Sequence, residues 1–229
     1  MLLKIFSFNF IFYFSILFFG VSLLPVLISK TLTRKTVRMW SRFVIFVFKQ
    51  IFKIQINFKN RYLNDNEGQV IAANHQSVFD TIFFLAAFDK TIYIIKKELI
   101  FIPIYGWYAM RLGNIYIDRK KKIESIKKIS KNIANLIKKN YKVVIFPEGT
   151  RQAPKKIGDI KPGIFLIQEK LKKPIFPVYI DSGSTWPKNS LKIKKRNILI
   201  KCLNPIPYGQ TKNEFKAILK KSYIESLQD

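Results

Sequence analysis

A run of 24 residues without a charged side chain, residues 5–28, constrains this 229-residue chain more than any other feature. Written as one helix, the run would be about 36 Å long, enough to cross a hydrocarbon layer of about 30 Å with some tilt. A cleaved signal peptide is the alternative, but the run is too long for the apolar part of such a peptide, and no clear small-residue cleavage site follows it. We therefore predict a retained membrane helix.

Basic residues predict how this helix is oriented. Five of them follow the run closely, whereas only Lys4 precedes it. By the positive-inside rule, the bulk of the protein would then lie on the cytoplasmic side. Residues 34–52 mix bases with aromatic side chains and predict a helix lying in the membrane interface; an amphipathic helix packed on the domain is the alternative. We divide the chain into a membrane-attachment segment at 1–52 and a domain at 53–229.

Apolar runs and amphipathic stretches alternate along the rest of the chain. Strands are predicted at residues 54–58, 70–73, 92–95, 114–117, 143–146, 175–180 and 198–203. The apolar run at residues 81–88 predicts the start of a helix, and further helices are predicted at residues 97–112, 121–139, 164–171 and 213–227. This alternation predicts an α/β fold with a mixed, mostly covered β-sheet and flanking helices.

Composition limits the partners of the chain. The formal charge of +27 favours an anionic partner: nucleic acid, an anionic membrane surface or a phosphorylated substrate. Phenylalanines gather in the first 60 positions rather than among the basic residues of the domain, so we expect no nucleic acid. The single cysteine, Cys202, lies in an apolar run and predicts a buried, inert thiol. One cysteine excludes an internal disulfide and a cysteine-rich metal site, and we predict no metal ion.

The only histidine, His75, stands between an apolar strand and the next helix, and Asp80 follows five positions later. Residues five apart on one helix point about 140° apart, so the two can meet only if His75 lies in the loop before the helix. Ser77 would then cap the helix and Asp80 would lie in its first turn. Such a pair suits a general base oriented by a carboxylate. The alternative is a structural histidine beside a capping box.

Two further segments combine a strand end with an arginine. Residues 113–119, with the sequence Gly-Asn-Ile-Tyr-Ile-Asp-Arg, place Arg119 at the carboxyl end of a strand, where ligands of α/β sheets gather. Residues 146–151 read Phe-Pro-Glu-Gly-Thr-Arg. There a guanidinium suits a phosphate monoester, and a glycine lets the backbone approach a ligand. The alternative is a structural turn with a salt bridge between Glu148 and Arg151.

Taken together and in this order, these segments resemble the motifs of the phospholipid/glycerol acyltransferase family, most of all the bacterial 1-acyl-sn-glycerol-3-phosphate acyltransferases. The first family motif, N-H-x4-D, matches residues 74–80, and the second, G-x-x-x-I-D-R, matches 113–119. The third, F-P-E-G-T-R, matches 146–151 without change, and the proline-rich fourth matches 174–180. The loop after the third motif departs from many members, because it reads Gln-Ala-Pro-Lys-Lys at 152–156.

The resemblance implies a membrane-bound enzyme that forms phosphatidic acid. It implies that His75 is the general base on the sn-2 hydroxyl of lysophosphatidic acid and that Asp80 orients it. Acyl-CoA or acyl-carrier protein would be the donor, without a cofactor. For substrate binding it implies Arg119 and Arg151 for the acceptor phosphate, with Lys97 as a third candidate. The other binding residues would be Glu148, Gly149 and Thr150 of the third motif.

The same resemblance implies a place in the cell and leaves alternatives open. The expected location is the bacterial inner membrane, with the catalytic domain on the cytoplasmic side. Other acceptors remain possible: glycerol-3-phosphate, another lysophospholipid or a glycolipid. A basic membrane protein that binds lipid without catalysis is the alternative from another class. No Gly-x-Ser-x-Gly nucleophile motif occurs in the sequence, in agreement with direct acyl transfer.

Overall fold

The computed structural model describes residues 1–117, 124–188 and 191–228. Its strands form one seven-stranded sheet in the order β1-β7-β6-β2-β5-β3-β4, in which every neighbouring pair runs parallel except β6 and β7. The strands are β1 (Ile56–Lys59), β2 (Gln69–Ala73), β3 (Thr91–Lys96), β4 (Ile115–Ile117), β5 (Lys142–Ile145), β6 (Ile175–Ile180) and β7 (Ile198–Cys202). The predicted α/β class with a mixed sheet is confirmed.

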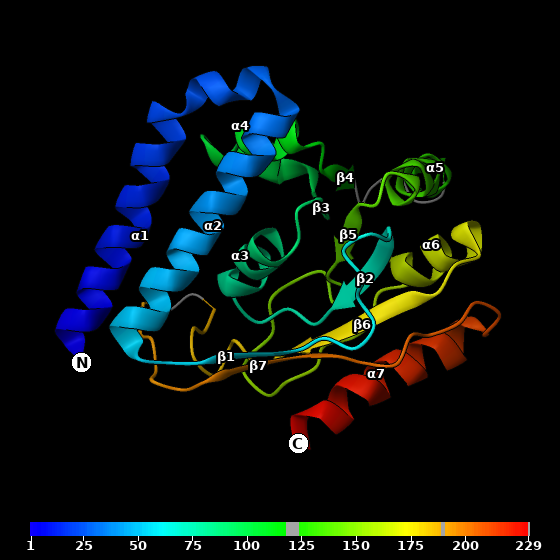
Figure 1. Ribbon diagram of the computed structural model, residues 1–229. Coiled ribbons are helices and arrows are strands. Elements are labelled where there is room, and N and C mark those ends of the chain that lie inside the picture. Colours follow the sequence, from blue (N-terminus) through cyan, green and yellow to red (C-terminus); the bar gives the residue numbers. More distant parts are fainter. Residues whose placement is uncertain (118–123, 189–190, 229) are drawn as a thin grey trace.

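Helices cover both faces of this sheet (Figure 1). They are α1 (Leu2–Ser22), α2 (Lys30–Phe52), α3 (Val78–Ala87), α4 (Tyr105–Leu112), α5 (Glu124–Lys138), α6 (Gly163–Leu171) and α7 (Lys212–Gln228), with short 3₁₀ helices η1 (Leu24–Ile28) and η2 (Lys97–Phe101). Side chains of α1, α2 and α3 share one hydrophobic core with the sheet, and those of α5, α6 and α7 share the other.

Strand β2 shows how the sheet is held between two cores. Ile71 and Ala73 belong to the core under α1, α2 and α3, whereas Val70 and Ala72 belong to the core under α5, α6 and α7. Successive side chains of a strand point to opposite faces, so a strand covered on both sides needs a continuous apolar run. The run at 70–73 therefore marks a central strand, and β2 does lie between β6 and β5.

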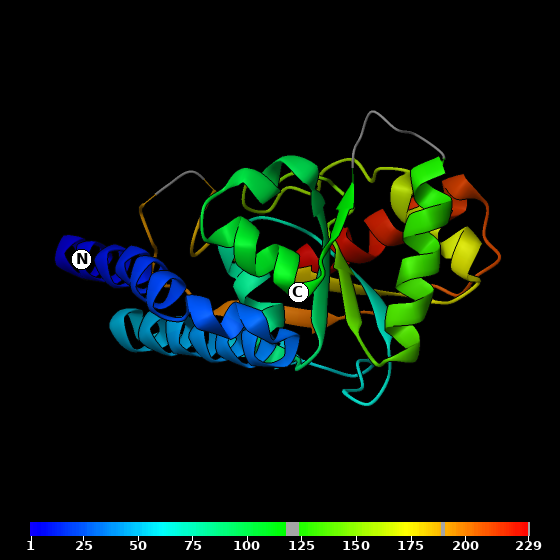
Figure 2. The same cartoon turned by 90° about the horizontal axis from the view of Figure 1, so that it is seen from above.

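The N-terminal apolar run does not form the single helix predicted for residues 5–28. Helix α1 ends at Ser22, and the 3₁₀ helix η1 with Pro25 near its start turns the chain back into α2. Proline lacks a backbone N–H and its ring clashes with the preceding helical turn, so a helix cannot continue regularly through it. Figures 1 and 2 show α1 and α2 lying side by side as a helical hairpin.

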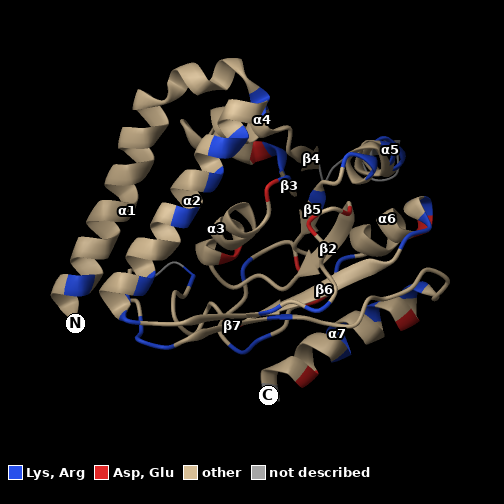
Figure 3. Cartoon of the chain, viewed as in Figure 1, with Lys and Arg blue, Asp and Glu red and all other residues tan. Residues whose placement is uncertain are grey.

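Helix α1 nevertheless keeps the properties of a membrane segment. With 21 residues it is the one helix in the described part of the chain that is long and apolar enough to cross a membrane, judged by length and composition. Figure 3 shows α1 almost free of charge beyond its first turns, while basic residues recur along α2. The outer face of α1 exposes large apolar side chains, among them Phe6, Phe10, Phe14 and Leu17.

Helix α2 begins at Lys30, with Ser29 as its N-cap, rather than near residue 34. One face is buried against the domain through Val44, Phe48 and Phe52, while Phe46 on another face is 59% exposed. The helix thus packs on the domain and also presents apolar surface to its surroundings.

Candidate active site

His75 lies in the loop that joins the carboxyl end of β2 to helix α3, as predicted. The preceding Asn74 fixes this loop to the end of the neighbouring strand β6. Its side-chain amide donates to the carbonyl of Ile180 (3.0 Å), and its side-chain oxygen accepts from the Ile180 N–H (2.7 Å). Ser77 is the N-cap of α3 and forms a capping box with Asp80, which also confirms the predicted helix start.

Asp80 is fully buried and accepts four hydrogen bonds. Its Oδ2 lies 2.9 Å from Nδ1 of His75 and accepts the N–H groups of Gln76 (2.8 Å) and Ser77 (2.9 Å). Its Oδ1 accepts the hydroxyl of Ser182. Because a carboxylate accepts and does not donate, this arrangement assigns the Nδ1 hydrogen to His75 and leaves Nε2 as the acceptor nitrogen. Asp80 therefore serves the capping box and the imidazole at once.

The imidazole of His75 is held flat against Phe146, the first residue of the third motif. The two ring centroids are 3.9 Å apart and the planes differ by 15°. The His75 side chain is 17% exposed, and its Nε2 has no hydrogen-bond partner within residues 1–117, 124–188 and 191–228. One ring nitrogen is thus fixed by a carboxylate, while the other is accessible as a base.

Glu148, which also belongs to the third motif, connects the loop after β5 to His75. Its Oε2 accepts the backbone N–H of His75 (2.8 Å) and its Oε1 accepts the N–H of Gly158 (2.7 Å). A further backbone bond runs from the N–H of Gln152 to the carbonyl of His75 (2.7 Å). The salt bridge considered between Glu148 and Arg151 is absent from the described part of the chain. The next residue, Gly149, has φ of 70°, a left-handed conformation that glycine adopts without strain.

Burial changes the ionisation of Glu148. Desolvation raises the pKa of this carboxyl from 4.5 to about 7, against the two backbone hydrogen bonds that lower it. The nearby negative charge of Asp80 raises it further. Glu148 is therefore a buried carboxyl that changes charge near neutral pH.

The other predicted binding residues lie around this centre. Arg151 is half-buried, and its guanidinium has no hydrogen-bond or ion-pair partner in the part of the chain that the structure describes, while its carbonyl accepts from Lys188 (3.1 Å). Thr150 is exposed. Lys97 is exposed just after β3, two strands from β2 in the sheet order. Arg119 lies outside the described residues.

Ser182 is a member of the site that the sequence did not reveal. It lies two residues beyond β6 and 102 positions from Asp80, whose Oδ1 accepts its hydroxyl. The parallel neighbours β6 and β2 end at the same edge of the sheet, so a polar residue after the fourth motif was the available signal. Finding it required the strand order.

Comparison with known proteins assigns this arrangement to a family. Residues 55–181, more than half of the chain, match the model of the family described as Acyltransferase. The chain belongs to the acyltransferase family. The matched region contains the dyad of His75 and Asp80, Glu148 and Arg151, so the family assignment rests on the part of the chain that carries the site.

Curated relatives of this acyltransferase include several proteins named 1-acyl-sn-glycerol-3-phosphate acyltransferase. The one from Pseudomonas aeruginosa is 29% identical over 164 residues, covering 72% of this chain and 64% of the relative. The one from Helicobacter pylori is 31% identical over 168 residues, covering 70% of each. The chain spans less than two thirds of the Pseudomonas relative and 55% of one from Cocos nucifera.

A solved structure shares the fold. The crystal structure of the 1-acyl-sn-glycerophosphate (LPA) acyltransferase PlsC from Thermotoga maritima matches with a TM-score of 0.78. The match covers 99% of this chain and 94% of the other, at 19% sequence identity. It confirms the seven-stranded, mostly parallel sheet together with the two N-terminal helices.

Proposed function

We propose that this acyltransferase moves a fatty acyl group from a thioester donor to the sn-2 hydroxyl of 1-acyl-sn-glycerol-3-phosphate, giving phosphatidic acid. The observation that carries the proposal is the imidazole of His75. Its Nδ1 is bound by the buried carboxylate of Asp80, and its Nε2 is accessible. The names of the relatives support this acceptor.

The chemistry follows from that geometry. Nε2 of His75 takes the proton of the acceptor hydroxyl, and the oxygen attacks the thioester carbonyl carbon. The tetrahedral intermediate collapses as the C–S bond breaks, and the thiolate leaves with the proton returned by His75. Asp80 stabilises the imidazolium and fixes its tautomer. No covalent acyl-enzyme is needed.

Phosphate recognition falls to the basic residues that follow neighbouring strands. The guanidinium of Arg151 is unpaired in the described part of the chain, so it is free to form a bidentate pair with the acceptor phosphate. We propose Arg119 as a second phosphate ligand and Lys97 as a third. Glu148 and Gly149 hold the loop that carries Arg151, and Thr150 offers a hydroxyl to the glycerol.

Membrane attachment belongs to the same proposal. Residues 1–52 would attach the enzyme to the bilayer and residues 53–229 would form the acyltransferase unit, within which the family match at 55–181 falls. The acceptor and the product are membrane lipids, so the apolar surface of α1 keeps the site near them. We propose that the site faces the cytoplasm, where the acyl donor is made.

The test is acyl transfer by purified protein in detergent or vesicles. Lysophosphatidic acid and glycerol-3-phosphate would be offered separately with palmitoyl- or oleoyl-CoA. We expect phosphatidic acid from the first acceptor, at least about a hundredfold less with His75→Ala, the scale of one general base. Lys127→Ala, on an exposed position of α5, is the matched control and should keep full activity. Activity that survives His75→Ala would refute the mechanism.

A further inference from the structure

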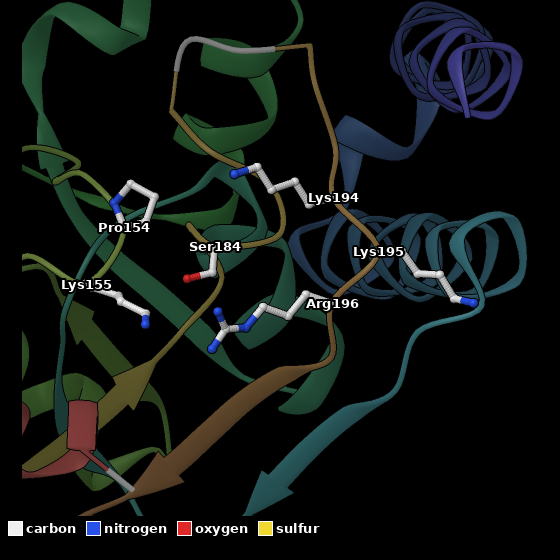
Figure 4. A pocket seen from close by; sticks show the side chains of 6 residues that line it. All are labelled: Pro154, Lys155, Ser184, Lys194, Lys195 and Arg196. Carbon is white, nitrogen blue, oxygen red and sulfur yellow. The ribbon is translucent and has the colours of Figure 1, made fainter.

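A basic cavity opens between the loops beside the candidate active site. Its volume is about 440 Å³, within the range of small-ligand sites, about 300–1,000 Å³. Figure 4 shows the six residues that line it: Pro154, Lys155, Ser184, Lys194, Lys195 and Arg196. They come from three loops: the one after the third motif, the one after β6 and the one before β7. The cavity, called here the basic pocket, has no role in the function proposed above.

The side chains of the basic pocket suit a ligand with several negative charges. Lys155 and Arg196 reach toward each other from opposite walls, and Lys194 points to the same side (Figure 4). Asp181 balances one of these charges, because its carboxylate pairs with Arg196 at 3.4 Å and accepts the hydroxyl of Ser184 at 2.6 Å. Lys155 and Lys194 leave the pocket with a net positive charge, which favours phosphate groups.

The backbone at Lys155 forms a tight turn. This residue has φ of 57°, a left-handed conformation that costs energy for any residue with a Cβ atom. A hydrogen bond from the N–H of Lys156 to the carbonyl of Ala153 closes the turn around it. The turn places Lys155 at the wall of the pocket.

Both walls of the basic pocket begin close to the dyad. Gln152, bonded to the His75 carbonyl, lies two residues before Pro154. Ser182, whose hydroxyl donates to Asp80, lies two residues before Ser184. Two residues of extended chain span at most about 7 Å. A ligand in the pocket is therefore next to the reacting centre.

We infer that the basic pocket binds the phosphates at the nucleotide end of coenzyme A, with the pantetheine arm leading the thioester to His75. The inference rests on the function proposed above and adds the donor to it. The acceptor carries one phosphate, for which Arg151 is available, whereas coenzyme A carries three and matches a cavity with several cations. The prosthetic group of an acyl-carrier protein has a single phosphodiester, so it would need fewer cations than the pocket offers.

Binding of adenosine 3′,5′-bisphosphate tests this without any turnover. Calorimetry in detergent would compare the wild type with Lys155→Ala, Lys194→Ala and Lys195→Ala. The first two should weaken binding about fivefold to tenfold, the scale of one typical solvent-accessible hydrogen bond. Lys195 lies in the same loop with its amine turned away (Figure 4), so its variant should stay within about twofold. If all three variants weakened binding equally, the nucleotide would be held only by the overall positive charge of the protein, and the inference would be overturned.

Steady-state kinetics can distinguish an effect on donor binding from an effect on acceptor binding. Lys194→Ala should raise the KM for palmitoyl-CoA about fivefold to tenfold and leave kcat and the KM for lysophosphatidic acid unchanged. A rise in the acceptor KM instead, or an equal rise with acyl-carrier protein, would overturn the inference. His75→Ala should bind the nucleotide normally. The protein could also bind the nucleotide in a Lys194-dependent way and yet be inactive on lysophosphatidic acid. That result would refute the proposed acceptor and support the inference about the basic pocket.

Discussion

At the scale of single residues, Asp80 combines two functions that are usually separate. Its Oδ2 accepts from two backbone N–H groups at the start of α3 and also faces Nδ1 of His75. The capping hydrogen bonds fix the position of the carboxylate and leave its negative charge unchanged, so it can still pair with an imidazolium. The carboxylate is thus positioned by the fold before any substrate arrives.

Asp80→Asn separates geometry from charge. An asparagine oxygen can take the place of Oδ2, and its amide can donate to the hydroxyl of Ser182, which is able to accept. The fold should survive, while kcat falls by about a hundredfold or more, because a neutral amide does not stabilise the imidazolium. Steady-state kinetics and a thermal melt of the variant would check this. A loss of kcat below about tenfold would contradict the role given to Asp80.

Ser182→Ala removes a donor and leaves the dyad in place. The buried Oδ1 of Asp80 would lose its partner, at a cost to stability of about 1–3 kcal/mol. We expect kcat to fall by less than about tenfold, since Nδ1 of His75 keeps its carboxylate. Ser182→Thr, which retains the hydroxyl, should restore most of the lost stability in thermal melts. No difference between the two variants would exclude a positioning role.

Glu148 makes stability depend on pH. Its folded pKa, about 7, lies above the unfolded value of 4.5, so the folded state holds the proton more tightly. Its contribution is therefore complete below pH 4.5 and is lost as pH rises through about 7. Relative to Glu148→Gln, the wild type should lose about 3 kcal/mol across this window, at 1.36 kcal/mol per pKa unit. The free energy of unfolding of both proteins, measured at each end of this pH window, would test the prediction. A difference between them that does not change with pH would refute it.

At the scale of elements, aromatic side chains fasten the N-terminal hairpin to the domain. Phe8 of α1 contacts Phe48 and Phe52 of α2 and the edge of Trp186, with ring centroids 5.0–5.6 Å apart. Trp186 lies in the loop that also contains Ser182, and its backbone N–H donates to the Ser182 carbonyl (2.8 Å). Helix α1 is thereby connected to the candidate active site through two contacts.

Phe8→Ala and Phe10→Ala form a matched pair on α1. Phe8 is 1% exposed and Phe10 is 61% exposed. Truncating the buried ring should lower the free energy of unfolding by about 3–5 kcal/mol. Truncating the exposed ring should leave stability in detergent unchanged and weaken partition into vesicles. Chemical unfolding and vesicle flotation distinguish these effects, and equal destabilisation by both would contradict the packing of α1.

Local patterns predicted most elements of this fold, and long-range packing decided the rest. The run at residues 70–73 and the capping residues around Asp80 carry their structure in a few neighbouring side chains, so β2 and the start of α3 were predictable. The break of the apolar run near Pro25 was not predicted, because length and hydropathy alone favour one continuous helix; Pro25 was the available signal. The ring contacts of Phe8 with α2 favour two packed helices over one continuous helix. The contact of Ser182 with Asp80 could be predicted only from the order of the strands in the sheet.

At the scale of the whole molecule, charge and apolar surface act together. We expect the formal charge of +27 to attract anionic lipid and the exposed face of α1 to partition into the acyl chains. Binding to anionic vesicles should therefore exceed binding to neutral ones. It should weaken as salt rises from about 0.1 M to about 1 M, which shortens the screening length from about 10 Å to about 3 Å. Sedimentation with the two kinds of vesicle, each at both salt levels, would test this; salt-independent binding would contradict it.

The pairing of β1 with β7 has a consequence for synthesis on the ribosome. The first strand of the sheet pairs with the last, and at this edge the backbone N–H of Gln55 donates to the side-chain oxygen of Asn197, 142 positions away. Helix α1 precedes all seven strands in the chain, so we expect it to be available to a membrane before the strand that completes the sheet has been made. Folding that depends on such distant contacts is slow, so we expect the sheet to stay incomplete, and the site inactive, until β7 has been translated.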